Sequence, residues 1–192
     1  MGMAAPIATG RSATGIPTGK LAIWWVVGSE IVIFGGLLAC YVMYRLKFDF
    51  WAESAAVTNT WAGALNTFVL LTSSLFAVLA HNAAENKKGA QAAGYLLLTI
   101  GGGLTFLMIK AFEWGYEISH GYTITASTFW SFYYTAAGIH AAHVIAGMIA
   151  MGIVALDAFQ GKNLHRVELV GIYWHFVDIV WIFLFPLLYI AK

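Results

Sequence analysis

The segment Tyr173-Trp174-His175-Phe176-Val177-Asp178-Ile179-Val180-Trp181 is the most informative part of this sequence. It lies within an apolar run over Val167–Ile190, which is long enough for a helix that crosses a bilayer. His175 and Asp178 are three residues apart, so they share one helix face and lie about 4.5 Å apart along its axis. Ionisable groups at membrane depth are costly and normally face the bundle interior. The pair therefore indicates either a functional group or a polar contact that only packs helices.

The composition assigns the whole chain to the integral membrane proteins. Hydrophobic residues make up 60% of the 192 residues and charged residues only 10%, whereas soluble domains are about a quarter charged. The mean hydropathy is +0.76. A net charge of +1 argues against a nucleic-acid partner. Cys40 is the single cysteine, which excludes an intrachain disulfide and a cysteine-based metal site.

The apolar runs predict an all-α protein, a bundle of five transmembrane helices without a second domain. The third helix is expected to continue for one or two amphipathic turns. Lys110 and Glu113 form an i, i+3 pair there, and Glu117 follows on the same face. The five predicted spans are Leu21–Tyr44, Trp61–Ala84, Ala92–Ile109, Phe129–Leu156 and Val167–Ile190.

The first 19 residues predict a disordered tail, which leaves residues 20–192 as the membrane domain. The tail has no basic start followed by an apolar core, so it is not expected to be a signal peptide. Lysines and arginines favour one side of the predicted bundle, which places the amino terminus in the cytoplasm and the carboxyl end outside. The inner set is Arg11, Lys20, Lys87, Lys88, Lys162 and Arg166, and the outer set is Arg45, Lys47, Lys110 and Lys192.

Ionisable residues from three predicted helices fall in one middle layer of the membrane, counted at about 1.5 Å per residue. They are Glu30, His140, His143, His175 and Asp178. A metal site is one interpretation, because His140-x-x-His143 places two imidazoles on one face. Glu117-x-x-His120 also matches half of a di-iron motif, but without a second copy. A proton path through Glu30 is another interpretation. The residues alone favour a hydrogen-bonded polar knot that fixes helix packing.

Together with the opening segment, four further blocks resemble subunit III of the heme-copper oxidases, in its short five-helix bacterial form. They follow the order and spacing of that family from Lys20 onward, and the tail before Lys20 matches nothing in it. The blocks are Gly28-Ser29-Glu30 continuing into Ile33-Phe34-Gly35-Gly36, then Leu65-Asn66-Thr67-Phe68-Val69-Leu70-Leu71, Lys110-Ala111-Phe112-Glu113-Trp114 and Gly138-Ile139-His140-Ala141-Ala142-His143-Val144.

The resemblance implies an accessory subunit with no catalytic residue and no metal of its own. In this family heme and copper belong to subunits I and II of an oxidase that reduces oxygen to water and pumps protons. Subunit III packs on subunit I in the bacterial cytoplasmic membrane, binds phospholipid between its helices, and supports proton uptake on the inner side. The complex can join a larger respiratory assembly. Glu30 matches the family's buried, carbodiimide-reactive carboxylate, and His140, His143, His175 and Asp178 match its polar positions.

Two features leave alternatives within and outside the family. Longer members begin with two further helices that form one arm of the lipid cleft, and this sequence is expected to lack them. Many quinol-oxidising members carry Asp where this chain has Glu30, which favours the cytochrome c branch. A quinol oxidase subunit, a free-standing proton or small-solute transporter built around Glu30, and a membrane metalloenzyme stay open.

A cationic rim is expected at the cytoplasmic end of the bundle. Basic groups near an anionic membrane surface attract phospholipid headgroups, each by about 1 kcal/mol. An ordinary positively charged flank without specific lipid would have the same composition. The candidate headgroup ligands are His81, Lys87, Lys88, Lys162, His165 and Arg166.

Overall fold

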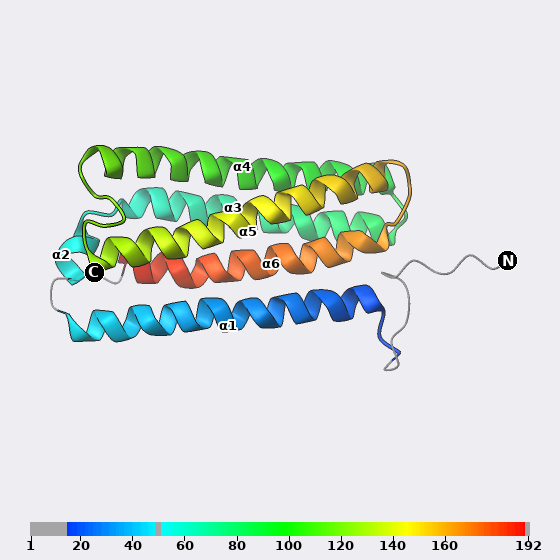
Figure 1. Ribbon diagram of the computed structural model, residues 1–192. Helices are drawn as coiled ribbons and strands as arrows, with labels where there is room; N and C mark the ends of the chain where they lie inside the picture. Colours follow the sequence, from blue (N-terminus) through cyan, green and yellow to red (C-terminus); the bar gives the residue numbers. More distant parts are fainter. Residues whose placement is uncertain (1–14, 49–50, 191–192) are drawn as a thin grey trace.

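The computed structural model describes residues 15–48 and 51–190, and over these ranges the chain consists of helices joined by short turns and loops (Figure 1). Five helices are long and apolar enough to cross a membrane, which confirms the predicted five-span all-α fold. The elements are α1 (Thr18–Lys47), α2 (Trp51–Ala56), α3 (Thr60–Glu85), α4 (Gly89–Ser119), α5 (Thr128–Phe159), α6 (His165–Phe185) and a closing π-helix, η2 (Pro186–Ile190). Residues 1–14 of the predicted tail lie outside the described residues.

Two elements differ from the prediction. Helix α4 runs without interruption to Ser119, so the amphipathic extension beyond Ile109 is longer than expected. The short helix α2 was not predicted, because its six residues are too few to show a helical period. Trp51 and Ala55 of α2 are buried against the bundle.

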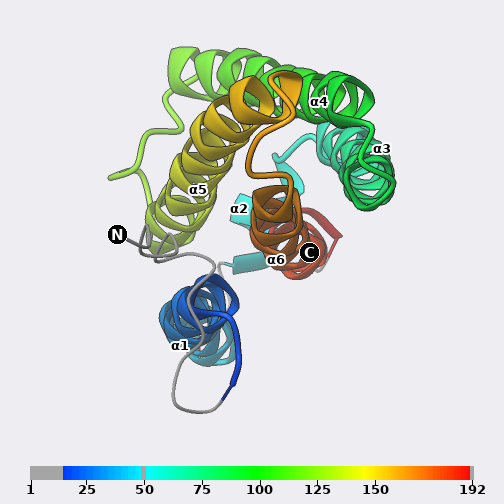
Figure 2. The same cartoon turned by 90° about the vertical axis from the view of Figure 1, so that its right-hand side faces the viewer.

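Helices α3 to α6 form an antiparallel bundle, and α1 lies to one side of it along α6 (Figures 1 and 2). Only three residues of α1 are buried, and they are spaced seven apart: Val27, Phe34 and Tyr41. Phe34 packs edge-on against His143 of α5, with ring centroids 5.3 Å apart. A seven-residue spacing keeps side chains on one helix face, so α1 is attached to the bundle through a single stripe.

Close approach of the helices depends on small residues in α4. A side-chain carbon on Gly102 would lie 2.5 Å from Ser73 Cβ of α3, and one on Gly103 would lie 2.8 Å from Met148 Sδ of α5. Membrane helices associate largely through such packing, because lipid provides no hydrophobic drive between them. These two glycines therefore set the spacing of α3, α4 and α5.

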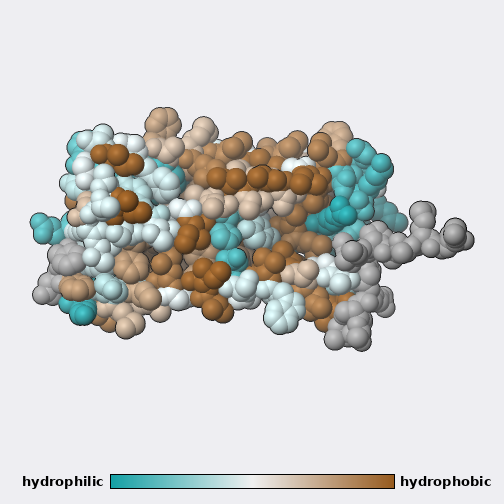
Figure 3. All heavy atoms as spheres, in the orientation of Figure 1, coloured by the Kyte–Doolittle hydropathy of each residue, from teal (hydrophilic) through white to brown (hydrophobic). Residues whose placement is uncertain are grey.

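The surface of the bundle has the polarity of a membrane-spanning protein (Figure 3). Apolar residues cover most of its middle length, while hydrophilic residues gather toward the two ends. Trp25 of α1 and Phe112 of α4 are among the large apolar side chains that lie exposed. A bilayer solvates such side chains, and the chain is therefore a multi-pass membrane protein.

Candidate functional site

Glu30 of α1 and His143 of α5 meet between the two helices. His143 Nε2 lies 3.0 Å from Glu30 Oε2, and the two side chains are 20% and 16% exposed. The Oε2 atom makes no well-aligned hydrogen bond among the described residues, so the contact is closer to an ion pair. Two of the five predicted middle-layer residues are thus in contact.

The His143–Glu30 contact requires one proton between its two groups. His143 Nδ1 lies 2.8 Å from the Ile139 carbonyl oxygen, which only accepts, so Nδ1 carries a hydrogen. Nε2 and the carboxylate oxygen then face each other at 3.0 Å, and both accept unless a proton sits on one of them. The pair is thus either imidazolium–carboxylate or neutral imidazole–carboxylic acid. In both states one proton lies between His143 Nε2 and the Glu30 carboxyl group.

His175 and Asp178 share a helix face as predicted but are not bonded to each other. His175 Nδ1 lies 2.6 Å from the Ser74 hydroxyl of α3. The Asp178 side chain is buried, and neither carboxylate oxygen has a hydrogen-bond partner among the described residues. Packing against α3 turns the imidazole toward Ser74. Ser74 also faces the Asp178 carboxyl group, so His175 and Asp178 meet the same serine rather than each other.

His140 does not join His143 in a common site. Its fully buried ring lies between Phe106 and Trp181, with centroids 5.4 and 5.2 Å away, and neither ring nitrogen has a hydrogen-bond partner in the described chain. His143 instead contacts α1. Within residues 15–48 and 51–190, no three His, Cys, Asp or Glu side chains are arranged to hold a metal ion.

A second polar group, which was not predicted, fills the interior between α4, α5 and η2. Lys110 lies in the predicted extension of the third helix but is only 2% exposed, so its side chain is inside the bundle. Its Nζ donates to Glu113 Oε2 at 2.9 Å, to the Tyr133 hydroxyl at 3.1 Å, and to the Tyr189 hydroxyl. The group, named the Lys110 cluster, consists of Lys110, Glu113, Glu117, Tyr133, Tyr134 and Tyr189.

Part of the Lys110 cluster was visible in the sequence. The i, i+3 and i+7 spacing of Lys110, Glu113 and Glu117 places them on one helix face. In the structure this face points into the bundle. The tyrosine partners lie on other elements, and no local pattern links them to this face.

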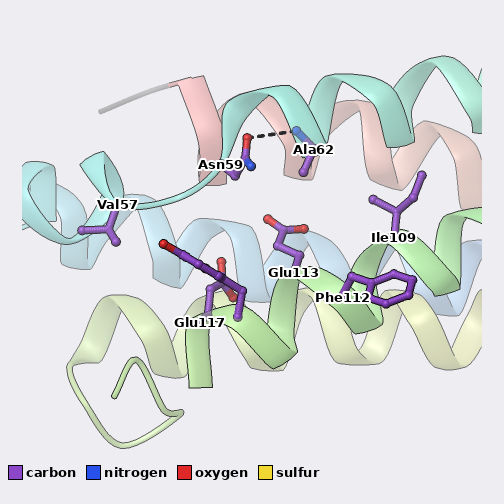
Figure 4. A pocket seen from close by; sticks show the side chains of 8 residues that line it. Val57, Asn59, Ala62, Ile109, Phe112, Glu113 and Glu117 are labelled. Atoms are coloured by element: carbon purple, nitrogen blue, oxygen red, sulfur yellow. Dashed lines mark hydrogen bonds between the residues drawn. The ribbon is translucent and has the colours of Figure 1, made fainter. Parts of the chain in front are cut away.

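A cavity of about 320 Å³ opens beside the Lys110 cluster, between the beginning of α3 and the end of α4 (Figure 4). The carboxyl group of Glu113 points into the space between these helices. The amide of Asn59 caps α3 by accepting from the backbone N–H of Trp61 and of Ala62. The lining residues are Val57, Asn59, Ala62, Ile109, Phe112, Glu113, Tyr116 and Glu117.

The predicted cationic rim residues come together at the opposite end, where α3 passes into α4 and α5 into α6. His81 and His165 line one cavity of about 120 Å³. Two of the six basic side chains have acidic partners: Arg166 lies 3.0 Å from Asp157, and His81 lies 3.5 Å from Glu85. The rim is therefore less positive than its basic residues alone suggest.

Comparison with known proteins gives consistent matches along the chain. The family described as cytochrome c oxidase subunit III matches residues 16–192. A heme-copper oxidase subunit I+III of Aeropyrum pernix is 32% identical over 183 residues, covering 90% of this chain but only 22% of that longer protein.

Two relatives of similar length also match. The cytochrome c oxidase subunit 3 of Corynebacterium diphtheriae is 34% identical over 173 residues, or 86% of this chain and 84% of that protein. The subunit 3 of Bacillus sp. strain PS3 is 30% identical over 190 residues, or 96% and 92%. With five spans, the Glu30–His143 contact and a family match over nearly all described residues, the chain belongs to the cytochrome c oxidase subunit III family.

Proposed function

We propose that this chain is a non-redox accessory subunit of a proton-pumping terminal oxidase that reduces oxygen to water. It stabilises subunit I and supports proton uptake on the inner side. The observation that carries the proposal is the Glu30–His143 contact, because Glu30 matches the family's buried carboxylate and an ionisable partner lies 3.0 Å from it. The match over residues 16–192 supports the same role.

The partners in this proposal are oxidase subunits I and II, which hold the heme and copper. The fused I+III protein of Aeropyrum pernix supports packing against subunit I, because one chain carries both subunits there. Cytochrome c is the proposed electron donor. The Corynebacterium and Bacillus relatives are both cytochrome c oxidase subunits by name, which supports cytochrome c over a quinol as the donor.

The proposed location is the bacterial cytoplasmic membrane, with the amino terminus in the cytoplasm and the carboxyl end outside. The rim supports this orientation, because Lys87, Lys88 and Lys162 are exposed at one end of the bundle. We propose that phospholipid headgroups bind at this rim. Native mass spectrometry should then detect retained phospholipid that is lost when these three lysines are replaced by glutamine.

The test of the accessory role compares the oxidase with and without this subunit. Without it, the initial rate of oxygen reduction should be retained, because every redox centre remains. Inactivation during turnover should become faster, or proton uptake slower. A complete and immediate loss of oxygen reduction, with subunits I and II fully loaded with heme and copper, would show that this chain takes part in the chemistry.

The role of Glu30 is tested within the complex by Glu30→Gln, with Glu85→Gln as the matched control. Glu85 is 68% exposed at the rim end and is paired only with His81. The Glu30 variant should slow proton uptake or hasten inactivation, and the Glu85 variant should not. A hydrophobic carbodiimide should label Glu30 in the native chain. Equal effects of the two variants would contradict the role given to Glu30.

A further inference from the structure

The Lys110 cluster has one more acidic than basic side chain. Lys110 is 2% exposed, Glu113 7% and Glu117 3%. With all three ionised, the cluster would carry a net charge of −1 within a membrane-spanning bundle. An uncompensated charge removed from water is strongly unfavourable, so buried charges are paired or neutralised.

Among the described residues, the elements packed around the cluster bring no second lysine or arginine. The buried imidazole of His140 on α5 lies between Phe106 and Trp181, with neither ring nitrogen hydrogen-bonded, an environment that disfavours the imidazolium form. Helix α5 contributes the hydroxyls of Tyr133 and Tyr134, and η2 contributes that of Tyr189. On the α3 side, the cavity is lined by Asn59 and Ala62, which are uncharged. Trp114 and Trp181 place their rings 5.6 Å from Lys110 Nζ, which stabilises its charge without adding another. Among the described residues, Lys110 is therefore the one cation that the two carboxylates share.

The hydrogen atoms available at Tyr133 and Tyr134 of α5 independently indicate that the cluster holds an additional proton. The Tyr133 hydroxyl lies 3.1 Å from Glu113 Oε1 and 3.0 Å from Glu117 Oε1, yet it has one proton to donate. The Tyr134 hydroxyl lies 2.8 Å from the Tyr122 carbonyl oxygen and 3.3 Å from Glu117 Oε2, again with one proton. If Glu117 is ionised, at least two of these four short contacts join oxygens with no hydrogen between them.

One added proton on Glu117 removes the excess charge and supplies a missing hydrogen. Glu113 is the less suitable holder, because Lys110 Nζ lies 2.9 Å from it and stabilises its ionised form. Glu117 contacts only tyrosine hydroxyls, which can accept a proton from it as well as donate. We propose that Glu117 binds one proton, exchanged with water in the adjacent cavity, and that the Lys110 cluster is thereby neutral at neutral pH.

The cavity gives this proton a route that does not pass through the bundle. Glu113 and Glu117 both line it (Figure 4). It opens between the beginning of α3 and the end of α4, whereas the rim lies where α3 passes into α4, at the opposite end of these helices. The Lys110 cluster is thus a proton-binding site separate from the Glu30–His143 pair. Proton binding at Glu117 does not depend on the function proposed for the chain.

Infrared difference spectroscopy tests the proposal on the full chain, purified with its associated subunits in lipid nanodiscs. The signal is the carbonyl stretch of a protonated carboxylic acid, identified by its shift in deuterium oxide. Each variant is subtracted from wild type at neutral pH, which cancels all other carboxyl groups. Glu117→Gln should lose the band of one carboxylic acid.

Charge balance makes two further outcomes specific. Glu113→Gln should also lose one band, because Lys110 then balances an ionised Glu117. Lys110→Met should gain one band, because both glutamates must then be protonated. Glu85→Gln, at an exposed position, should leave the carbonyl region unchanged.

Two results would overturn the proposal. One is a Glu117→Gln spectrum identical to wild type, which would mean that Glu117 is ionised and that a cation in the cavity balances the charge. The other is a band that persists in Glu113→Gln, which would mean that local burial rather than charge balance protonates Glu117. Glutamine has nearly the same size and shape as glutamate. The Glu117→Gln and Glu113→Gln variants therefore test the proposal even if Lys110→Met does not fold.

Discussion

Glu30 and Glu113 are both acidic residues inside membrane-spanning helices, but their surroundings differ. Among the described residues, Glu30 has one ionisable partner, His143, across a boundary between helices, and both side chains are partly exposed. Glu113 has Lys110 on its own helix and the Tyr133 hydroxyl of α5, and it is almost fully buried. The first contact depends on where α1 lies, and the second depends on the bundle core. The comparison separates a polar contact that docks a helix from one that is part of the fold.

Replacing Lys110 should have the largest effect on stability. Lys110→Ala leaves Glu113 and Glu117 without their cation and creates a cavity. Breaking a buried ion pair by removing one partner costs about 3–5 kcal/mol. Unfolding in mixed micelles should show this loss, with Lys110→Met milder because it fills the same space. A loss below about 1 kcal/mol for Lys110→Ala would place the cluster in the same class as an exposed ion pair.

Replacing Glu30 should have a smaller and more local effect. Glu30→Ala removes the partner of His143, at a cost of about 1–3 kcal/mol for a polar group left unsatisfied. Because α1 is held by one stripe, hydrogen exchange should rise along α1 and stay unchanged in α3 and α4. A uniform rise over all helices would show that the pair belongs to the core rather than to the docking of α1.

Ser74 and Asp178 lie at a third polar position, where the effects of two substitutions on stability can be compared. Ser74→Ala removes the hydrogen bond to His175 and should cost about 1 kcal/mol. Asp178→Asn should change the free energy of unfolding by less, because the amide has the same size and can still meet Ser74, and no well-aligned hydrogen bond of the carboxylate is lost among the described residues. The same unfolding measurement ranks the two variants. The reverse order would mean that Asp178 gains a partner in the membrane, such as a buried water molecule.

The smallest effect is expected for the ion pair of Lys20 and Glu168, which joins α1 to α6. Its atoms lie 2.6 Å apart, but the side chains are 40% and 32% exposed. Exposed pairs contribute about 0–1 kcal/mol and weaken with salt. Lys20→Ala should therefore change the free energy of unfolding by less than Glu30→Ala. The effect of Lys20→Ala should vanish at high salt. A salt-independent effect as large as that of Glu30 would show that α1 is held mainly at its end.

The five spans were predictable because each is a long apolar run, and run length alone separates a membrane helix from a soluble one. The short α2 was not, since six residues show no period. Pairing within the polar layer was not predictable from the sequence. Glu30 had three histidines in its layer and meets His143, and His175 had both Asp178 on its own helix and Ser74 on α3 within reach. Helix spacing says which residues share a face but not which neighbour a side chain meets.

The Lys110 cluster shows the other limit of the sequence. Its charged residues follow a clear helical spacing, but a face with Lys and Glu is usually solvated, and composition favoured that interpretation. What buries it is Tyr133 and Tyr189, which lie 23 and 79 residues beyond Lys110 in the chain. Tyrosine hydroxyls carry no formal charge, so no charge pattern identifies them as partners. Only the packed structure brings them to the lysine.

The π-helix η2 has a consequence for the order in which the molecule is completed. It ends at Ile190, and the last carbonyls of a helix have no partner within that helix, so they can accept from distant side chains. Tyr41 of α1 donates to the Leu187 carbonyl at 2.6 Å, and Thr60 of α3 donates to that of Tyr189 at 3.1 Å. Every one of these donors leaves the ribosome before its acceptor. The contacts that join α1, α3 and α4 to this turn must therefore wait until α6 has been inserted, and closure of the bundle is a late step of synthesis.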